Sequence, residues 1–339
     1  MLPGKVPPDV LIRSVFPFLG SDDRDVILGP SIGRDASLIR VGDTVFVVST
    51  DPVTGSVEDI GWIAVNVNAN DIATFGVRPR WFLLSVLLPP GSTPQDLERI
   101  MRQVHEASLA LGVSVVGGHS EVTEGLGRPI ITGFMIGVTK EGAYVTSSGA
   151  RPGDVIVLTK TVGLEGTSIL CTEGRDVLHK HLPYEVVQAG MSLRSMISVV
   201  KDGTAAYSTG LVTAMHDPTE GGVYGGIHEI CDASGTGCEI DSTTIPLHPA
   251  TERLCHLLNI DPLGLISSGC MLMTCPSQDK DRLVQALTDA GIPTTCIGRV
   301  TADAARRVMS TGDATRSLPR PLTDELWVAL RRMESLRTS

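Results

Sequence analysis

Apolar and β-branched runs alternate with amphipathic stretches along most of the chain. Residues 44–50 and 155–159 are rich in β-branched residues, and residues 81–88 form a continuous apolar run, so each predicts a strand. The clearest helix is expected from Pro94, because Thr93 is a suitable N-cap and Gly112 supplies a C-terminal stop. This alternation predicts an α/β (α+β) protein.

The remaining elements follow from the same patterns. Further helices are expected near residues 58–75, 164–172, 184–200, 219–232, 249–258, 277–290 and 322–335, and further strands near 113–116, 130–139, 212–216, 237–240, 269–274 and 295–300. Turn residues at 150–154 indicate a domain boundary, and 339 residues suit two domains better than one. We therefore expect a leader segment over 1–30, an N-terminal domain over 31–150 and a C-terminal domain over 151–339.

Composition narrows the possible partners. The net charge of −10 argues against nucleic acid, because phosphate backbones bind to basic surfaces. No apolar run approaches the length of a membrane span, and the first residues do not resemble a signal peptide. Seven scattered cysteines, an odd number, are typical of reduced thiols. The sequence therefore predicts a cytoplasmic protein without nucleic-acid or membrane partners.

Three aspartates stand in separate segments where metal ligands are plausible. Asp35 follows a glycine turn, Asp51 is expected at the end of the 44–50 strand, and Asp71 shares a helix face with apolar residues. A carboxylate on a buried face is costly unless it is paired or binds a metal, and oxygen ligands of this kind suit Mg²⁺. Alternatively, Asp51 belongs to a turn, and Asp71 joins a local network with Asn68 and Asn70.

Two glycine-containing segments could contact phosphate. Gly117 and Gly118 are expected to end a strand, where their N–H groups can form an anion nest and His119 can contact phosphate or order a carboxylate. After the 155–159 strand, the Lys160 side chain and the backbone N–H groups of residues 163–167 can also donate to a phosphate. Without a ligand, Gly117 and Gly118 would be a tight turn, and residues 163–167 would be a strand-to-helix loop.

A third segment, residues 215–223, reads as the start of a helix. Asp217 fits an N-cap, Pro218 the first helical position and Glu220 the reciprocal capping residue. The glycines that follow weaken a helix by about 1 kcal/mol each, which close packing against a ligand or another backbone would explain.

Together these segments resemble the PurM-like superfamily, which includes aminoimidazole ribonucleotide (AIR) synthase, selenophosphate synthetase, thiamine-monophosphate kinase and the hydrogenase maturation protein HypE. The matching stretches are residues 33–36, 49–52, 70–79, 116–122, 163–167 and 217–222, which occur in the family's order. Within the superfamily the chain looks most similar to HypE and its relatives.

The resemblance implies a two-domain fold. The N-terminal α/β domain would form a dimeric β-barrel with a second copy, and the C-terminal domain would be an α/β sandwich. ATP would bind near the interface, with Mg²⁺ on Asp35, Asp51 and Asp71. Asp71 and His119 would act in catalysis. Nucleotide contacts are implied for Asn68, Asn70, Gly117, Gly118, Lys160, Gly163, Gly166, Thr167, Asp217 and Thr219.

Several positions depart from the family pattern. HypE proteins end in a cysteine tail, whereas this sequence has no cysteine after Cys296, and Ser268 stands where HypE has a glutamate. His119 replaces an aspartate that many members carry, and the N-terminal catalytic cysteine or lysine of selenophosphate synthetase is not expected here. True carbamoyl dehydration is therefore disfavoured.

The expected function is ATP-dependent activation of an acceptor oxygen by phosphoryl transfer, on a small-molecule or protein-borne acceptor. The alternative is a nucleotide-binding regulator or metalloenzyme maturation factor without turnover.

Overall fold

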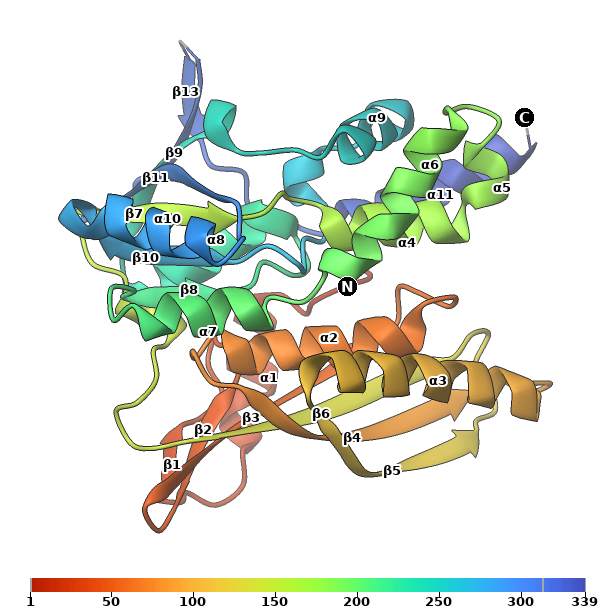
Figure 1. Ribbon diagram of the computed structural model, residues 1–339, viewed down its shortest axis with the longest axis horizontal. Coiled ribbons are helices and arrows are strands. Elements are labelled where there is room, and N and C mark those ends of the chain that lie inside the picture. The colour runs from red at the N-terminus through yellow and green to blue at the C-terminus, as the bar shows by residue number, and fades with distance from the viewer. Residues whose placement is uncertain (1, 313, 339) are drawn as a thin grey trace.

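The computed structural model, which describes residues 2–312 and 314–338, has two halves that are each built on one mixed β-sheet (Figure 1). Helices α2 (Ile60–Ala73) and α3 (Pro94–Leu111) lie between the N-terminal sheet and the C-terminal half, in which a further group of helices lies beside the C-terminal sheet. The expected two-domain α/β architecture is confirmed. None of the helices in the described ranges combines the length and apolarity that a bilayer span requires.

The N-terminal sheet has six strands in the order β1-β2-β3-β6-β4-β5. All neighbouring pairs are antiparallel except β4 and β5, which are parallel. The strands are β1 (Val26–Leu28), β2 (Ser37–Val41), β3 (Thr44–Val53), β4 (Pro79–Leu88), β5 (Ser114–Val122) and β6 (Ile130–Thr139).

The C-terminal sheet has seven strands in the order β13-β12-β9-β11-β7-β10-β8, and only β9 and β12 pair in parallel. The strands are β7 (Asp154–Thr159), β8 (Ala214–His216), β9 (Gly237–Asp241), β10 (Leu272–Pro276), β11 (Thr294–Thr301), β12 (Arg307–Thr311) and β13 (Ala314–Ser317).

The α-helices are α1 (Pro8–Ser14), α2 (Ile60–Ala73), α3 (Pro94–Leu111), α4 (Leu164–Glu173), α5 (Arg175–Leu178), α6 (Tyr184–Ser192), α7 (Val200–Ser208), α8 (Gly222–Ser234), α9 (Pro249–Leu258), α10 (Lys280–Asp289) and α11 (Glu325–Thr338). Short 3₁₀ turns lie at Phe16–Phe18, Ser147–Gly149, Leu193–Met196, Ser242–Thr244, Pro262–Gly264 and Ser277–Asp279.

Helix α3 forms where local chemistry predicts it. The Thr93 side chain accepts a hydrogen bond from the Asp96 N–H, the Asp96 carboxylate accepts one from the Thr93 N–H, and Gly112 ends the helix in the left-handed conformation with φ 69°. Such a capping box satisfies two of the backbone groups that a helix start leaves unpaired.

Helix α2 is buried on nearly every side, although one apolar face was expected. Thirteen of its fourteen residues are buried, because the helix packs on β3 and β6 below and against α7 above. Asp71 is therefore buried by its position between the halves and not by belonging to one apolar face.

Three expected elements differ from the structure. Strand β3 continues through Asp51 to Val53, so Asp51 lies within the strand. Gly117 and Gly118 also lie inside a strand, β5, and form no turn. The single helix expected over 184–200 is divided into α6, a 3₁₀ turn and α7, because Ile197 and Val199 use their backbone groups to bind Asn70 on α2.

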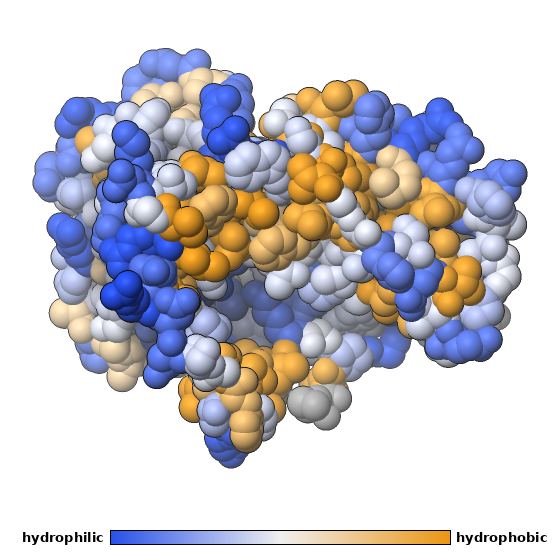
Figure 2. Space-filling view, turned by 90° about the horizontal axis from the view of Figure 1, so that it is seen from below, coloured by the Kyte–Doolittle hydropathy of each residue, from blue (hydrophilic) through white to orange (hydrophobic). Residues whose placement is uncertain are grey.

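One face of the N-terminal sheet is left open. Phe46, Val48, Leu83, Phe134 and Ile136 alternate with buried residues and share the side of the sheet that faces away from α2 and α3. We call these residues the free face. Figure 2 looks toward the molecule from this side and shows apolar groups gathered over its middle, next to a hollow.

Candidate functional site

Four aspartates from separate elements approach one another between the two halves. Asp35 precedes β2, Asp51 lies on β3, Asp71 lies on α2 and Asp217 follows β8. Burial raises the pKa of Asp217 to about 8, with Asp35 and Asp51 adding to the rise. Burial and the charges of Asp51, Asp217 and Asp35 likewise raise the pKa of Asp71 well above its usual range. The four carboxylates therefore form one electrostatically coupled group, which we call the carboxylate site.

His216 links this group to α8. Its Nδ1 lies 2.8 Å from Asp35 Oδ1 and its Nε2 lies 2.8 Å from Glu229 Oε2. Burial lowers the pKa of His216, but Asp35 and Glu229 raise it more, to about 10. The imidazole is therefore protonated at neutral pH, and it fixes the Asp35 carboxylate in place.

Asp217 is the most telling member of the site. It is 1% exposed, and neither of its carboxylate oxygens has a hydrogen-bond partner within the described residues. The expectation that Asp217 caps a helix is wrong: α8 begins later, at Gly222, and the N–H of Gly221 donates instead to Asp324 at 2.6 Å. The Asp217 side chain is thereby left free for another ligand.

The donors of the carboxylate site fit a hard divalent cation. Carboxylate oxygens of Asp35 and Asp217 lie within 4.8 Å of each other, with Asp51 and Asp71 in electrostatic range, whereas both nitrogens of the nearby His216 are already engaged by Asp35 and Glu229. A buried carboxylate without a donor is stable only if it is neutral or binds a cation. Mg²⁺ prefers such carboxylate oxygens and completes its shell with water and phosphate.

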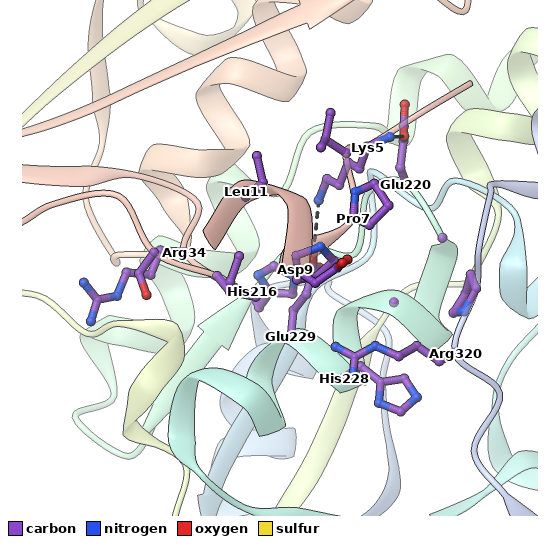
Figure 3. Close-up of a pocket in the computed structure, with 18 of the residues that line it drawn as sticks. Lys5, Pro7, Asp9, Leu11, Arg34, His216, Glu220, His228, Glu229 and Arg320 are labelled. Carbon is purple, nitrogen blue, oxygen red and sulfur yellow. Dashed lines mark hydrogen bonds and ion pairs between the residues drawn. The ribbon is translucent and has the colours of Figure 1, made fainter. Parts of the chain in front are cut away.

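Lys5 enters this region from the N-terminal segment (Figure 3). Its Nζ lies 3.3 Å from Glu229 Oε1, and its side chain is about half exposed, at 52%. Burial lowers the Lys5 pKa, but the charges of Glu229, Asp51 and Asp35 raise it by more, so the pKa lies above its ordinary value. Sequence reasoning missed Lys5, since we expected no catalytic lysine near the N-terminus. No local sequence signal marks Lys5, because its contact with Glu229 joins residues more than 220 positions apart.

Asn68 and Asn70 brace the carboxylate site. Asn68 Oδ1 accepts a hydrogen bond from the Asp51 N–H at 3.0 Å, and its Nδ2 donates to Ala64 O at 2.9 Å. Asn70 Nδ2 donates to Ile197 O at 2.9 Å, and Asn70 Oδ1 accepts from the Val199 N–H at 2.8 Å. Both amides thus hold the segments that carry the aspartates.

The lysine and glycines after β7 make buried contacts within the C-terminal half. Lys160 Nζ lies 3.0 Å from Asp202 Oδ1, and the Gly163 N–H donates to Ser267 Oγ at 2.8 Å. Gly166 and Thr167 lie in α4, where a Cβ on Gly166 would come within 2.5 Å of Leu265 and the Thr167 hydroxyl bonds to that of Thr251 at 2.9 Å. In these contacts the residues pack α4 and anchor the loop that leads into it.

Gly117, Gly118 and His119 lie on the edge strand β5, and the fold separates them from the aspartates of the same chain. In register, Asp51 pairs with Gly133, Gly133 with Leu84, and Leu84 with Gly118. Three strand spacings amount to about 14 Å. His119 is exposed, and its Nε2 lies 2.9 Å from Glu121 Oε2.

Two cavities border Lys5 and Glu220. The larger, of about 540 Å³, carries Asp35, His216 and Glu229 together with Arg34, His228 and Arg320. Figure 3 shows the larger cavity beneath the N-terminal segment, with Lys5 and Glu229 joined across it. The smaller cavity, of about 320 Å³, is lined by Asp51 and Thr219. The carboxylate site therefore lies between two hollows.

The family models match both halves. Residues 33–139 match the N-terminal domain of AIR synthase related proteins, and residues 151–310 match their C-terminal domain. The carbamoyl dehydratase HypE of Azotobacter vinelandii is 32% identical over 254 residues, 74% of this chain and 72% of that protein. The chain belongs to the AIR synthase-related family.

Within this PurM-like superfamily the chain is close to HypE. A putative hydrogenase expression/formation protein of Methanocaldococcus jannaschii is 27% identical over 300 residues, 86% of this chain and 87% of that protein. The crystal structure of hydrogenase maturation protein HypE in complex with ATP superposes with a TM-score of 0.67 at 23% identity, over 96% of this chain and 97% of that one. The PurM-like fold expected from the sequence motifs is thus confirmed.

Proposed function

We propose that this protein is an ATP-dependent, HypE-related enzyme that transfers a phosphoryl group to an acceptor oxygen, with Mg²⁺ bound by Asp35, Asp51 and Asp71. The single observation that carries the proposal is Asp217, a buried carboxylate without a partner among the described residues, set beside three further carboxylates. A bound cation would offset the cost of burying these carboxylates together, which protonation otherwise has to meet. The HypE structure solved with ATP supports the nature of the nucleotide.

The chain's own residues would position the reactants and neutralise charge. Phosphoryl transfer depends mainly on such positioning and electrostatic stabilisation, and bound Mg²⁺ would supply the largest share of the positive charge. The larger cavity is also lined by Lys5, Arg34 and Arg320, of which Lys5 is paired with Glu229 and Arg320 with Asp232. His216 holds Asp35, and Asn68 holds the backbone of Asp51. Asp71 would ligate the metal or accept the proton of the acceptor.

We further propose a homodimer that forms through the free face of the N-terminal sheet. Phe134 is 37% exposed there, and the edge strand β5 is exposed along its whole length, including Val115, Val116 and Val122. Contiguous apolar surface and an unpaired strand edge both favour association. Such a dimer would cover the face that Figure 2 shows.

A second candidate, a nucleotide-binding maturation factor without turnover, is favoured by the position of Lys5. Its ammonium already stands among Glu229, Asp51 and Asp35, where it offsets part of the charge that a metal would neutralise. Single-turnover hydrolysis of ATP by the purified protein separates the two functions.

Asp71→Asn tests the proposed enzyme. The variant should fold, because the amide is isosteric and removes charge repulsion, but ATP turnover should be abolished. Turnover equal to that of the wild type would rule out the role of Asp71. Thermal denaturation in the presence of MgATP reports nucleotide binding separately from turnover.

A further inference from the structure

A third cavity, of about 670 Å³, lies where the two halves of the molecule meet. The N-terminal half contributes residues at the start of β4 and the last turn of α3, and the C-terminal half contributes the loop into α7, the first turns of α7 and the turn after α10. Figure 1 shows α7 at this boundary, directly above α2. Among the described residues, none lines both this cavity and either cavity beside Lys5, so the third cavity is separate from the carboxylate site.

The lining of this third cavity is basic. It carries four cationic side chains and one acidic side chain, whereas the chain as a whole has a net charge of −10. The cationic residues are Arg78, Arg80, Lys160 and Lys201, and the acidic residue is Asp202. We call this space the basic cavity. A local excess of positive charge in an acidic protein favours the binding of an anion at that place.

Lys160 neutralises the acidic group of the lining. Its Nζ donates to Asp202 Oδ2 at 3.1 Å and to Ser198 O at 2.8 Å, and the two charged side chains are only 10% and 4% exposed. Lys160 holds this position although its backbone has φ 55°, a left-handed conformation that is costly for a residue with a Cβ. Because Asp202 is paired in this way, it does not offset the charge of the other three cations.

Those three cations, Arg78, Arg80 and Lys201, are exposed and available. Over residues 2–312 and 314–338, none of them forms an ion pair. The guanidinium carbon of Arg80 lies 4.5 Å from the centroid of the Trp81 ring, and stacking of this kind orients a guanidinium while its N–H groups stay free to donate. Lys201 Nζ lies close to Gly291 in the cavity wall, since a Cβ on Gly291 would lie 3.9 Å from it. Both halves of the molecule thus offer cationic donors to one hollow.

Backbone groups at the basic cavity narrow the choice of anion. Helix α7 begins there without a side-chain cap from Val199, and its first N–H groups favour negative charge. The last turn of α3 also lines the cavity, and its carbonyl groups can accept hydrogen bonds from hydroxyls. The apolar part of the lining suits a short carbon skeleton and consists of Pro79, Met196, Val200 and Ile292. A matching ligand therefore combines an anionic group with hydroxyl groups on a carbon skeleton.

We propose that the basic cavity binds a small phosphate monoester that carries hydroxyl groups. Arg78, Arg80 and Lys201 bind the phosphate group, because three cations match a dianion better than a single carboxylate and the fork of arginine fits phosphate oxygens. The last turn of α3 accepts from the hydroxyl groups. This site is additional to the carboxylate site, and its ligand contacts both halves of the molecule at once.

Glycerol 3-phosphate, inorganic phosphate and glycerol are matched probes of this site, because each of the last two carries one part of the first. The readout is the ε-methyl signal of Met196, which lines the basic cavity, in the methionine-labelled full chain. The signal is assigned with Met196→Leu, and Met333 on α11, which is 3% exposed, serves as the internal reference.

Glycerol 3-phosphate should shift the Met196 signal with a dissociation constant of about 1 mM or below. Inorganic phosphate should bind more weakly, and glycerol should leave the signal in place. Higher ionic strength should weaken the binding of both phosphates, because the cations are exposed. Neither Mg²⁺ nor nucleotide is present, so failure of the proposed function would leave this result intact.

Substitutions of arginine decide whether the cations of the basic cavity bind the phosphate. Arg78→Gln should weaken binding of glycerol 3-phosphate about tenfold or more, and Arg78→Lys, which keeps the charge but loses the fork, should have an intermediate affinity. Arg253→Gln is the matched control, since Arg253 is exposed on α9 and lines none of the three cavities, and it should bind within about twofold of the wild type. All three side chains replaced here are exposed, and cooperative thermal unfolding checks that the variants fold.

An unmoved Met196 signal, an equal response to glycerol, or an Arg78→Gln variant that binds as tightly as Arg253→Gln would each overturn the proposal. Inorganic phosphate that binds as tightly as glycerol 3-phosphate would overturn the part assigned to the hydroxyl groups.

Discussion

The clearest quantitative test of the carboxylate site is the substitution Asp217→Asn. Asp217 has an ordinary pKa of 3.8, and burial beside Asp35 and Asp51 raises it to about 8 in the folded protein. At pH 7 folding must therefore protonate a group that is ionised in the unfolded chain. The 3.2 pH units between 3.8 and 7 correspond to about 4 kcal/mol of lost stability at roughly 1.4 kcal/mol per unit.

Asparagine has the same shape and carries no such penalty. The metal-free variant should thus be more stable than the wild type by up to about 4 kcal/mol, a rise in melting temperature of roughly 8 °C or more. Its response to Mg²⁺ should be weaker, because Asp217 stands beside the proposed ligands, whereas the wild type should gain about 2.7 kcal/mol when Mg²⁺ is present at 100 times its dissociation constant. Differential scanning calorimetry with and without Mg²⁺ measures both effects.

Asp202→Asn is the matched control. Asp202 is 3% exposed, nearly as buried as Asp217, but it forms an ion pair with Lys160, whose Nζ donates to Asp202 Oδ2 at 3.1 Å. Removing one partner of a buried ion pair costs about 3–5 kcal/mol, so the same chemical change should lower the melting temperature here. If Asp217→Asn lowers it as much as Asp202→Asn does, the argument for an unsatisfied carboxylate fails.

Three further predictions concern pH, Lys5 and the free face. The raised pKa values of His216 (from 6.5 to about 10) and Asp217 (from 3.8 to about 8) mean that the folded protein holds protons which the unfolded chain releases. Metal-free stability should therefore fall as pH rises from about 3.8 to 8 through Asp217 and from about 6.5 to 10 through His216, and urea denaturation midpoints that stay constant from about pH 4 to 10 would contradict the coupling. Lys5→Met removes a competing cation and should strengthen Mg²⁺ binding about three- to tenfold by isothermal titration calorimetry, whereas weaker binding would place Lys5 outside the competition. Phe134→Glu puts a charge on the free face and should convert a dimer to a monomer in sedimentation velocity, and a variant that stays dimeric would exclude this interface.

Elements with strong local signals were predictable from the sequence. The capping box of Thr93 and Asp96 and the left-handed Gly112 define α3 within eighteen residues, without help from distant segments. The strand of residues 81–88 was recognisable in the same way from its apolar run, although only every second residue of the run is buried.

Elements whose ends depend on tertiary contacts were not predictable. The break between α6 and α7 exists because Ile197 and Val199 bind Asn70, more than 120 residues earlier in the chain. Asp217 resembled a helix cap, but a distant aspartate, Asp324, takes up the Gly221 N–H and displaces the start of α8. Pairings of this kind leave no trace in a local pattern.

The same distinction applies to the site. Asp35, Asp51 and Asp71 could be proposed because each is a carboxylate in an unusual local setting, and the structure brings all three to the carboxylate site. Lys5, His216 and Glu229 were missed. Their significance arises only when the N-terminal segment, β8 and α8 meet.

The hydrogen bonds of Asn70 also restrict the movement of Asp71, the next residue in the chain. Its amide is tied through two hydrogen bonds to the backbone that leads into α7, and the next residue is Asp71. Any rocking of one half of the molecule against the other must either break these bonds or carry Asp71 along with the C-terminal half. While these two bonds hold, Asp71 moves with the half that carries Asp217, so the spacing of the two oxygen donors is set during folding.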